Sequence, residues 1–411
     1  MPIRAKYGPP GGSPTRKQAA DLDAADPLRA FPDRFAIDPE IVYLDGNSLG
    51  CLPWTTLERL NDVVALEWGA RGVRAWDEGW LELPLEVGDR LGTAVLGAAP
   101  GQVVIGDSTT VCFYKLACAA LDARPGRSKI ITDLDNFPTD RYVLEALARD
   151  RQLAWLEGDP CGGPEPEAVA AVIDEDTALV TFSHVAYRSA HIADMAAINA
   201  IVRDAGALML WDLSHSAGSV PLSLDGDRAP LAVGCTYKYL NGGPGAPAFM
   251  YVARELQAEI HQPIWGWLGR REPFEMAPGY EADSGVRGLL SGTPPVLALT
   301  AVDEGVRIVT EAGMDAIRVK GIALTELAIA LADARLAPLG VSVASPRDFA
   351  RRGAHVALAH PHARELCARL IEVGVIPVFR HPDVIRFGLS PLTTRFVDVW
   401  DGVEALRRLL D

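Results

Sequence analysis

The sequence predicts an α/β protein, in which a large domain with a mainly parallel sheet flanked by helices is followed by a small α+β domain. Apolar runs that suit strands buried on both faces, KIITDLD (129–135), TALVTFSHV (177–185) and ALMLWDLSH (207–215), alternate with amphipathic stretches. A helical pattern ended by Gly206 separates the last two runs. This order of strand, helix and strand is typical of βαβ units.

The texture of the chain changes near residue 300. Long helical patterns rich in Ala, Leu and Arg follow, and then two shorter strands, HVALAH and DVIRFGLS, with a helix between them. The first residues are rich in Pro and Gly and lack the apolar core of a signal peptide. We therefore expect a loose leader over 1–25, an N-terminal segment packing with the small domain over 26–70, the large α/β domain over 71–300 and the small C-terminal α+β domain over 301–411.

Composition excludes several classes of function. The formal net charge of −15 over 411 residues argues against nucleic-acid binding, which needs a basic face. No apolar run is long enough to cross a bilayer. The 6 cysteines form no CxxC pair or His/Cys cluster, so we expect no metal site, and scattered free thiols suit a reducing cytoplasm.

Polar residues follow four of the predicted strands. Because ligands of open parallel sheets bind at the carboxyl ends of the strands, these residues are candidates for a binding site. Hydroxyl groups and free N–H groups at the start of a helix also form an anion site. The residues are Ser108, Thr109 and Thr110 after QVVIGD, Asn136 to Asp140 after KIITDLD, Ser183 and His184, and Asp212, Ser214 and His215.

One lysine stands apart from the rest. The chain has few lysines, and for Lys115, Lys129 and Lys320 a solvated charge on a helix or strand is the simple interpretation. Lys238 instead lies between two tyrosines in GCTYKYLNGGPG, before a glycine-rich backbone that permits close approach. A lysine that forms a Schiff base needs such a partly desolvated site. Alone, the stretch also fits a tight loop with a surface lysine.

Together these residues describe a site for pyridoxal 5′-phosphate. The ring nitrogen of this cofactor must stay protonated, and a neighbouring carboxylate raises its pKa, so Asp212 at a buried strand end is the candidate. We expect Phe137 to cover the ring face and Lys238 to form the Schiff base. Thr109 and Thr110 are expected to bind the phosphate.

The sequence resembles the kynureninases, members of the aspartate-aminotransferase-like, fold-type-I group of pyridoxal phosphate enzymes. The resemblance spans nearly the whole chain after the leader, and its most specific part combines GNSLG with the tyrosine-lysine stretch and the preceding aspartate. The matching stretches are YLDGNSLG (43–50), GDSTT (106–110), NFPTD (136–140), WDLSHSAG (211–218), GCTYKYLNGGPG (234–245), GWLG (266–269) and VIRFGLSPL (384–392).

The resemblance implies a role for individual residues. It adds His215, Asp140 and Ser183 to the cofactor contacts, and it gives Tyr237 a phosphate contact and a part in proton transfer. It also implies that Trp267 and Thr293 complete the phosphate site of the neighbouring subunit. We therefore expect a homodimer with the active site at the subunit interface.

The resemblance further implies a reaction. This is the hydrolysis of L-kynurenine, and possibly of 3-hydroxy-L-kynurenine, to anthranilate and L-alanine by cleavage of the Cβ–Cγ bond. The reaction belongs to tryptophan catabolism and to the kynurenine pathway that supplies NAD biosynthesis. Lys238, Tyr237 and Asp212 would be the catalytic residues. Arg386 and Ser48 would bind the substrate, and Trp76, which stands where bacterial members carry tryptophan, would contact its ring.

Two alternatives stay open on the sequence. Other fold-type-I enzymes such as cysteine desulfurases and epimerases share the Asp, His and Lys framework, and desulfurases need a nucleophilic cysteine on a mobile loop. Cys161, in GDPCGGPEP, is the only cysteine in such a setting. A cofactor-binding regulator without catalysis is the second alternative, although no DNA-binding helix pair or basic face supports it. The pattern also leaves the preference for a ring substituent undecided.

Overall fold

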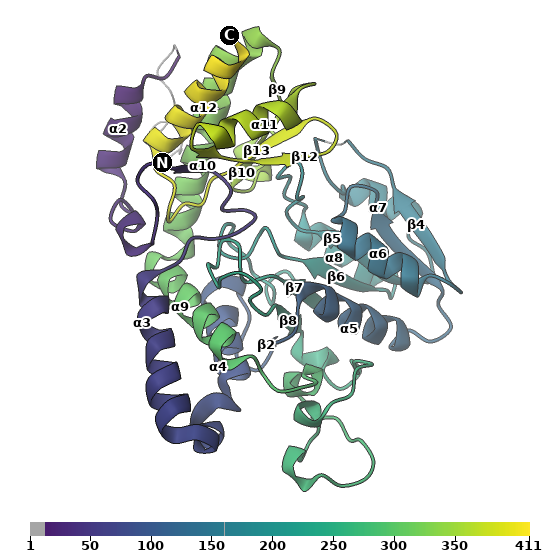
Figure 1. Cartoon of the computed structure of the whole chain (residues 1–411). Helices are drawn as coiled ribbons and strands as arrows, with labels where there is room; N and C mark the ends of the chain where they lie inside the picture. The colour runs from purple at the N-terminus through teal and green to yellow at the C-terminus, as the bar shows by residue number, and fades with distance from the viewer. Residues whose placement is uncertain (1–12, 160) are drawn as a thin grey trace.

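The computed structural model describes residues 13–159 and 161–411, and it has a large domain and a smaller one (Figure 1). The large domain contains a seven-stranded sheet with the order β2-β8-β7-β6-β5-β3-β4. Only β8 runs antiparallel to its neighbours, so the predicted mainly parallel sheet is confirmed. The strands are β2 (Val103–Ile105), β3 (Lys129–Asp133), β4 (Gln152–Leu156), β5 (Thr177–Ser183), β6 (Leu208–Asp212), β7 (Leu231–Gly234) and β8 (Phe249–Val252).

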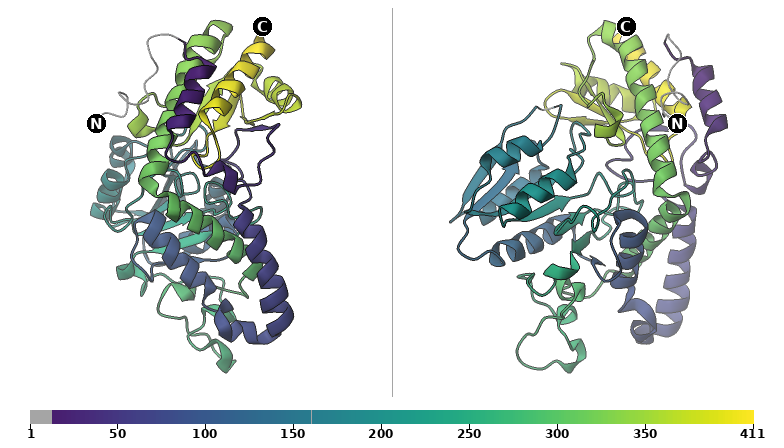
Figure 2. Two further views of the ribbon diagram at one scale, coloured as in Figure 1. Left: turned by 90° about the vertical axis from the view of Figure 1, so that its left-hand side faces the viewer. Right: turned by 180° about the vertical axis from the view of Figure 1, so that it is seen from behind.

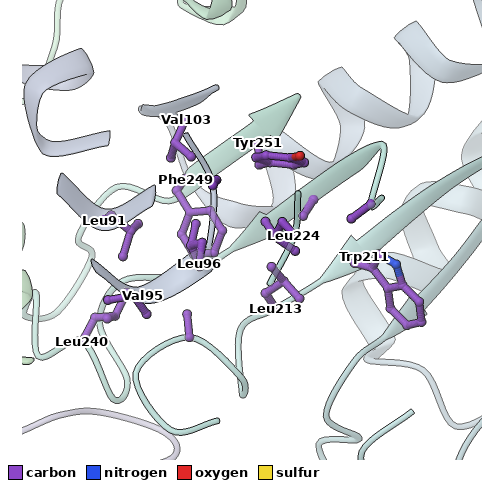
Figure 3. Packing of buried hydrophobic residues seen from close by; sticks show 14 of the residues in the cluster. Leu91, Val95, Leu96, Val103, Trp211, Leu213, Leu224, Leu240, Phe249 and Tyr251 are labelled. Carbon is purple, nitrogen blue, oxygen red and sulfur yellow. The ribbon is translucent and has the colours of Figure 1, made fainter. Parts of the chain in front are cut away.

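Both faces of this sheet are buried. In β6, Met209 and Trp211 face one hydrophobic core while Leu208 and Leu210 face another, as the two-residue period of a strand requires. Figure 3 shows part of the first core, where Phe249 of β8 lies among leucines and valines and Trp211 of β6 lies at one side of the cluster. The helices of this domain are α3 (Trp54–Asp62), α4 (Leu83–Leu91), α5 (Thr109–Asp122), α6 (Pro138–Leu147), α7 (Pro166–Val172) and α8 (Met195–Asp204).

The small domain has its own sheet and its own core. Its four strands have the order β12-β13-β10-β9 and are all antiparallel. Helix α9 leads from the large domain into α10 of the small domain (Figure 2). The elements are β9 (Ser342–Val343), β10 (His355–Ala359), β12 (Val378–Arg380), β13 (Val384–Gly388), α9 (Val296–Ala312), α10 (Met314–Leu331), α11 (Ala363–Glu372) and α12 (Phe396–Leu410).

The N-terminal segment contacts the small domain. Strand β1 (Val42–Tyr43) pairs in parallel with β11 (Val375–Ile376), and Leu44 is buried in the core of the small domain. Helix α3, farther along the chain, packs against α9 instead. The domain boundaries at 70 and 300 stay predictions.

The structure differs from the expected loose leader at residues 16–25, which form helix α2 (Arg16–Ala25). Thr15 and Gln18 cap this helix reciprocally, and its Asp23 accepts hydrogen bonds from the first N–H groups of α12, at 2.7 Å from Phe396. The Pro/Gly-rich composition that suggested disorder lies before this capping signal. Residues 1–12 lie outside the described residues. None of the described helices is long and apolar enough to span a membrane.

A buried ion pair joins the N-terminal segment to α10. The Lys320 ammonium lies 2.8 Å from Asp26 Oδ2, with side chains only 3% and 4% exposed. Asp26 also accepts a hydrogen bond from the Leu28 N–H. Burial lowers the pKa of Lys320, and the carboxylate opposes this effect.

Replacing Lys320 by Met should destabilise the protein by about 3 kcal/mol, because Asp26 would stay buried without its partner. Urea unfolding of the wild type and the variant measures the change. The double variant Asp26→Leu, Lys320→Met removes both charges and should recover at least half of the loss. A double variant no more stable than Lys320→Met would contradict this account of the pair.

Candidate functional site

Lys238 is almost completely buried at the centre of the site. Its ammonium lies 3.4 Å from His215 Nε2, and it stands over the rings of Phe137 and Tyr237, at 5.8 and 6.0 Å from their centroids. It forms no ion pair with a carboxylate in the described part of the chain. Among the described residues no carboxylate forms a hydrogen bond with this amine, so the amine can take part in covalent chemistry.

The other buried lysines differ from this pattern and from our expectation. Lys115, Lys129 and Lys320, interpreted from the sequence as solvated charges, are all buried. Each pairs with a carboxylate, Lys115 with Asp107 at 2.6 Å and Lys129 with Asp174 at 2.9 Å. Sequence could not reveal this because the segments that cover these lysines are distant in the chain. The contrast strengthens the assignment of Lys238.

Two buried carboxyl groups lie together near Lys238. Asp212 ends β6, and its Oδ1 accepts a hydrogen bond from the Ser214 N–H at 2.8 Å. Asp140, on α6, has one carboxyl oxygen without a partner. Burial and, second, the neighbouring Asp212 raise the pKa of Asp140 well above its usual value. This favours a proton on Asp140, so the two carboxyl groups can share it, and a protonated ring nitrogen fits beside such a pair.

Two uncharged imidazoles border the same space. Burial, and then Lys238, lower the pKa of His215 well below its ordinary value. The ring of His355, the first residue of β10, lies 5.7 Å away, and burial followed by Arg386 lowers its pKa likewise. The backbone carbonyl of Arg188 favours the protonated form of His355. Neither ring nitrogen of His355, however, has a partner at hydrogen-bonding distance and angle among the described residues. Sequence reasoning missed His355, although a histidine opening a buried strand is a signal.

Ser183 and Phe137 are linked through Asn136, and Phe137 in turn contacts Tyr187. The sequence assigned no individual role to Asn136 or Tyr187. Ser183 Oγ donates to Asn136 Oδ1 at 2.9 Å, and this fixes the loop that presents Phe137. The Phe137 ring packs edge-on against Tyr187, with centroids 5.4 Å apart. The Tyr187 carbonyl in turn accepts a hydrogen bond from Arg386. These contacts place the predicted ring-covering residue beside the predicted carboxylate-binding residue.

Arg386, in the middle of β13, is a second buried cation. Its Nη2 lies 3.2 Å from Ser48 Oγ, and its Nε lies 3.3 Å from the side-chain oxygen of Asn47 when that amide is oriented to satisfy both its groups. Burial lowers its pKa to about 9. No carboxylate pairs with it among residues 13–159 and 161–411. Uncharged groups therefore hold the guanidinium in position, and Asp45 acts on its charge without forming an ion pair with it, so the guanidinium can bind a substrate carboxylate.

Gly50 explains how the N-terminal segment reaches this site. Its N–H donates to the Tyr237 carbonyl at 2.7 Å, and a Cβ at this position would lie 2.3 Å from the Lys238 carbonyl oxygen. Only glycine permits this approach. The close contact carries Ser48, two residues earlier, toward Arg386.

Thr109 and Thr110 open helix α5, as predicted. Ser108 caps the helix, and the preceding Asp107 has a left-handed backbone (φ 51°) and is held by Lys115. The Asp107 carbonyl accepts from the Ala248 N–H at 2.9 Å, and Thr236 donates to the adjacent Pro247 carbonyl at 2.6 Å. The helix start is thus tied to the segment that carries Lys238, with an N-terminus suited to phosphate.

Three predicted residues lie apart from this group. Trp76 and Thr293 line a separate apolar cavity of about 460 Å³, which none of Lys238, Asp212 or Arg386 lines. Trp267 packs against Phe274, with ring centroids 5.8 Å apart. In the described chain, Trp76 and Thr293 therefore line a cavity that is separate from the residues around Lys238.

His184, which follows β5, gives the site region a testable dependence on pH. Its Nδ1 lies 2.9 Å from Ser216 Oγ, and burial lowers its pKa to about 4. Between pH 6.5 and about pH 4, His184 binds a proton in the unfolded chain but not in the folded chain. The contribution of His184 is therefore present above pH 6.5 and is lost as the pH falls toward 4.

Replacing His184 by Asn should remove about 2 kcal/mol of the stability that the cofactor-free protein loses between pH 7 and pH 5. Urea unfolding at both pH values measures the difference. The same replacement at the exposed His261 is the matched control and should leave the wild-type dependence. Equal losses in the wild type and His184→Asn would refute the assignment.

Solved structures share this fold. A cysteine desulfurase from Thermococcus onnurineus NA1 superimposes with a TM-score of 0.79 at 18% sequence identity, covering 92% of this chain and 97% of that one. A cysteine desulfurase from Escherichia coli gives a TM-score of 0.78 at 18% identity, covering 93% and 98%. At this identity the likeness concerns the fold, and it confirms the predicted fold-type-I architecture.

Sequence relatives are more specific. Residues 317–406 match the family model of the kynureninase C-terminal domain. Kynureninase from Burkholderia pseudomallei (strain 1106a) is 43% identical over 406 residues, covering 97% of this chain and 96% of that one. Kynureninase from Pseudomonas fluorescens is 41% identical over 402 residues, with coverage of 97% and 96%. These relatives do not favour the desulfurase alternative, and the chain belongs to the kynureninase family.

Proposed function

We propose that this protein hydrolyses L-kynurenine to anthranilate and L-alanine, with pyridoxal 5′-phosphate bound at Lys238. The observation that carries the proposal is a pair of buried cations, Lys238 and Arg386, which form no ion pair among the described residues and are joined by contacts through Ser48, Gly50 and Tyr187. The Lys238 amine can react with the aldehyde of the cofactor, and the Arg386 guanidinium can bind a carboxylate. Together they fit a cofactor and an amino-acid substrate.

The residues present fit the cofactor in kind and in arrangement. The Asp140–Asp212 pair suits a protonated ring nitrogen, and Phe137 offers an aromatic face close to the Lys238 ammonium. Ser183 and His215 line the same space. Thr109 and Thr110 at the start of α5, together with Tyr237, would hold the phosphate.

The bound cofactor supplies an electron sink that stabilises negative charge next to the substrate amine. Lys238 would move the proton at the substrate α-carbon, with the uncharged His215 3.4 Å from its nitrogen. Arg386 and Ser48 would bind the α-carboxylate, and this fixes the α-carbon in front of the lysine. Tyr237 would relay protons when water adds across the Cβ–Cγ bond, with the hydroxyl going to the carbonyl carbon and a proton to Cβ.

We also propose a homodimer in which each site uses two chains. Of the three residues that lie apart from Lys238, Trp267 and Thr293 are those expected to serve the neighbouring subunit, and Trp76 lines the same cavity as Thr293. Several large apolar side chains near them are exposed, including Trp68 and Trp265. A second copy would cover this surface and complete the site. A cytoplasmic location, expected from the scattered thiols, is likewise a proposal, and it agrees with all six cysteines being free.

The ring preference follows from the cavity beside Trp76. Its lining is apolar apart from the hydroxyl of Thr293 and the indole N–H groups. A hydroxyl added to the substrate ring would be buried there with few partners, at a cost of about 1–3 kcal/mol. We therefore propose that the unsubstituted ring of L-kynurenine is preferred over the 3-hydroxy form.

The purified, cofactor-loaded enzyme should release fluorescent anthranilate from L-kynurenine. Lys238→Ala should lose this turnover by at least a thousandfold, because no other lysine in the described part of the chain lies at this site to take the α-proton. The visible absorbance band of the wild type should also disappear on borohydride treatment. Fully loaded enzyme that releases no anthranilate, or that forms sulfide from L-cysteine instead, would sink the proposal.

Mixing two inactive variants tests the shared site. Lys238→Ala and Trp76→Ala, unfolded together and refolded, should regain about a quarter of wild-type turnover, because half of the random dimers hold one intact site of two. Lys238→Ala mixed with Asp212→Asn is the control and should regain none. Recovery in neither mixture would show that each chain builds its own complete site.

A further inference from the structure

The indole of Trp76 is held in place by Trp80 and, through Trp80, by Glu67, neither of which is among the predicted site residues. The Trp80 ring packs edge-on against it, with centroids 5.3 Å apart and planes at 87°. Edge-to-face geometry brings the positive ring edge of one indole to the negative face of the other. Trp80 thus limits the rotation of Trp76.

Trp80 is itself held by a carboxylate. Its Nε1–H donates to Glu67 Oε2 at 2.7 Å, and the other carboxylate oxygen pairs with Arg59 Nη2 at 2.5 Å. Arg59 belongs to helix α3, which packs against α9. Glu67 therefore anchors the indole pair to a helix that is fixed by the large core.

The backbone between the two indoles also requires a special residue. Gly79 has φ 144°, a conformation that side chains rarely permit, and the Leu81 N–H returns to the Trp76 carbonyl. This tight turn brings Trp80 back toward Trp76. The pair is therefore built by the sequence and is not a chance contact of exposed side chains.

Both indoles line the apolar cavity of about 460 Å³, together with Trp68 and the segment from Thr293 to Ala298. A substrate ring in this cavity would lie against the plane of Trp76. A fixed indole plane would give the substrate ring a fixed space, in which an additional hydroxyl would find few hydrogen-bond partners.

We propose that Glu67 and Trp80 are positioning residues that set the choice of aromatic ring by fixing the plane of Trp76. This inference rests on the proposed function, because it assigns the cavity to the aromatic end of the substrate. Loss of the Glu67 hydrogen bond would let Trp80 and Trp76 turn, which weakens binding of L-kynurenine and admits 3-hydroxy-L-kynurenine more readily.

The test compares kcat and KM for the two substrates in Glu67→Ala, Glu67→Gln and Trp80→Ala. Glu67→Ala and Trp80→Ala should reduce the preference for L-kynurenine by about three- to tenfold, the range expected for an aromatic pair, mainly through KM. Glu67→Gln keeps an acceptor for the Trp80 N–H and should restore most of the preference. Near-ultraviolet circular dichroism reads the coupling of the indole pair directly and should change in both alanine variants.

Glu78→Ala is the matched control, because Glu78 is an exposed acid of the same segment that pairs with Arg71. It should keep the wild-type ratio and spectrum. A wild type that turns over L-kynurenine, together with alanine variants of unchanged ratio and spectrum, would overturn the positioning role and leave the proposed function intact. A folded, loaded wild type that releases no anthranilate would overturn both.

Discussion

Lys238 and Arg386 are buried cations that form no ion pair in the described part of the chain, and the site is organised around them. The two residues come from different domains. A series of contacts through Ser48, Gly50 and Tyr187 connects them. The free energy of folding must offset the cost of burying both. Neighbours that keep the charges in place without neutralising them, such as the uncharged His215 and the amide of Asn47, are consistent with a site that receives its negative charge from ligands.

This constraint also explains why the small domain must meet the large one closely. Arg386 lies on β13 and Lys238 follows β7, so neither strand alone brings the charges together. The N-terminal segment connects β13 with the segment that carries Lys238. Its Asp45 forms a parallel β-bridge with Gly388, and its Gly50 lies against the backbone of Lys238. Side chains larger than hydrogen at Gly50 would separate the two halves of the site.

Much of this arrangement could be predicted from the sequence because it depends on local pattern. The ends of strands can be predicted from the apolar runs. Asp212 and Ser183 end β6 and β5, and Thr109 begins the helix that follows β2. What depends on long-range packing could not be predicted. The burial of Lys115 requires the segment near Leu289, 174 residues away, and α2 is stabilised by the start of α12. The burial of His355 beside His215 likewise depends on how distant segments pack together.

The separation of the two groups of site residues has a consequence for recognition. The charged end of an amino-acid substrate is matched by Arg386 and Lys238, whereas the apolar cavity that suits its ring is lined by Trp76 and its neighbours. In the proposed dimer these two surfaces belong to different chains, so neither recognises the whole substrate alone. Ring selection could then change while the chemistry stays the same, because Trp80 lines the apolar cavity and Glu67 acts on the cavity through the Trp80 N–H. The cofactor site would stay constant while residues 63–80 adjust the ring that it accepts.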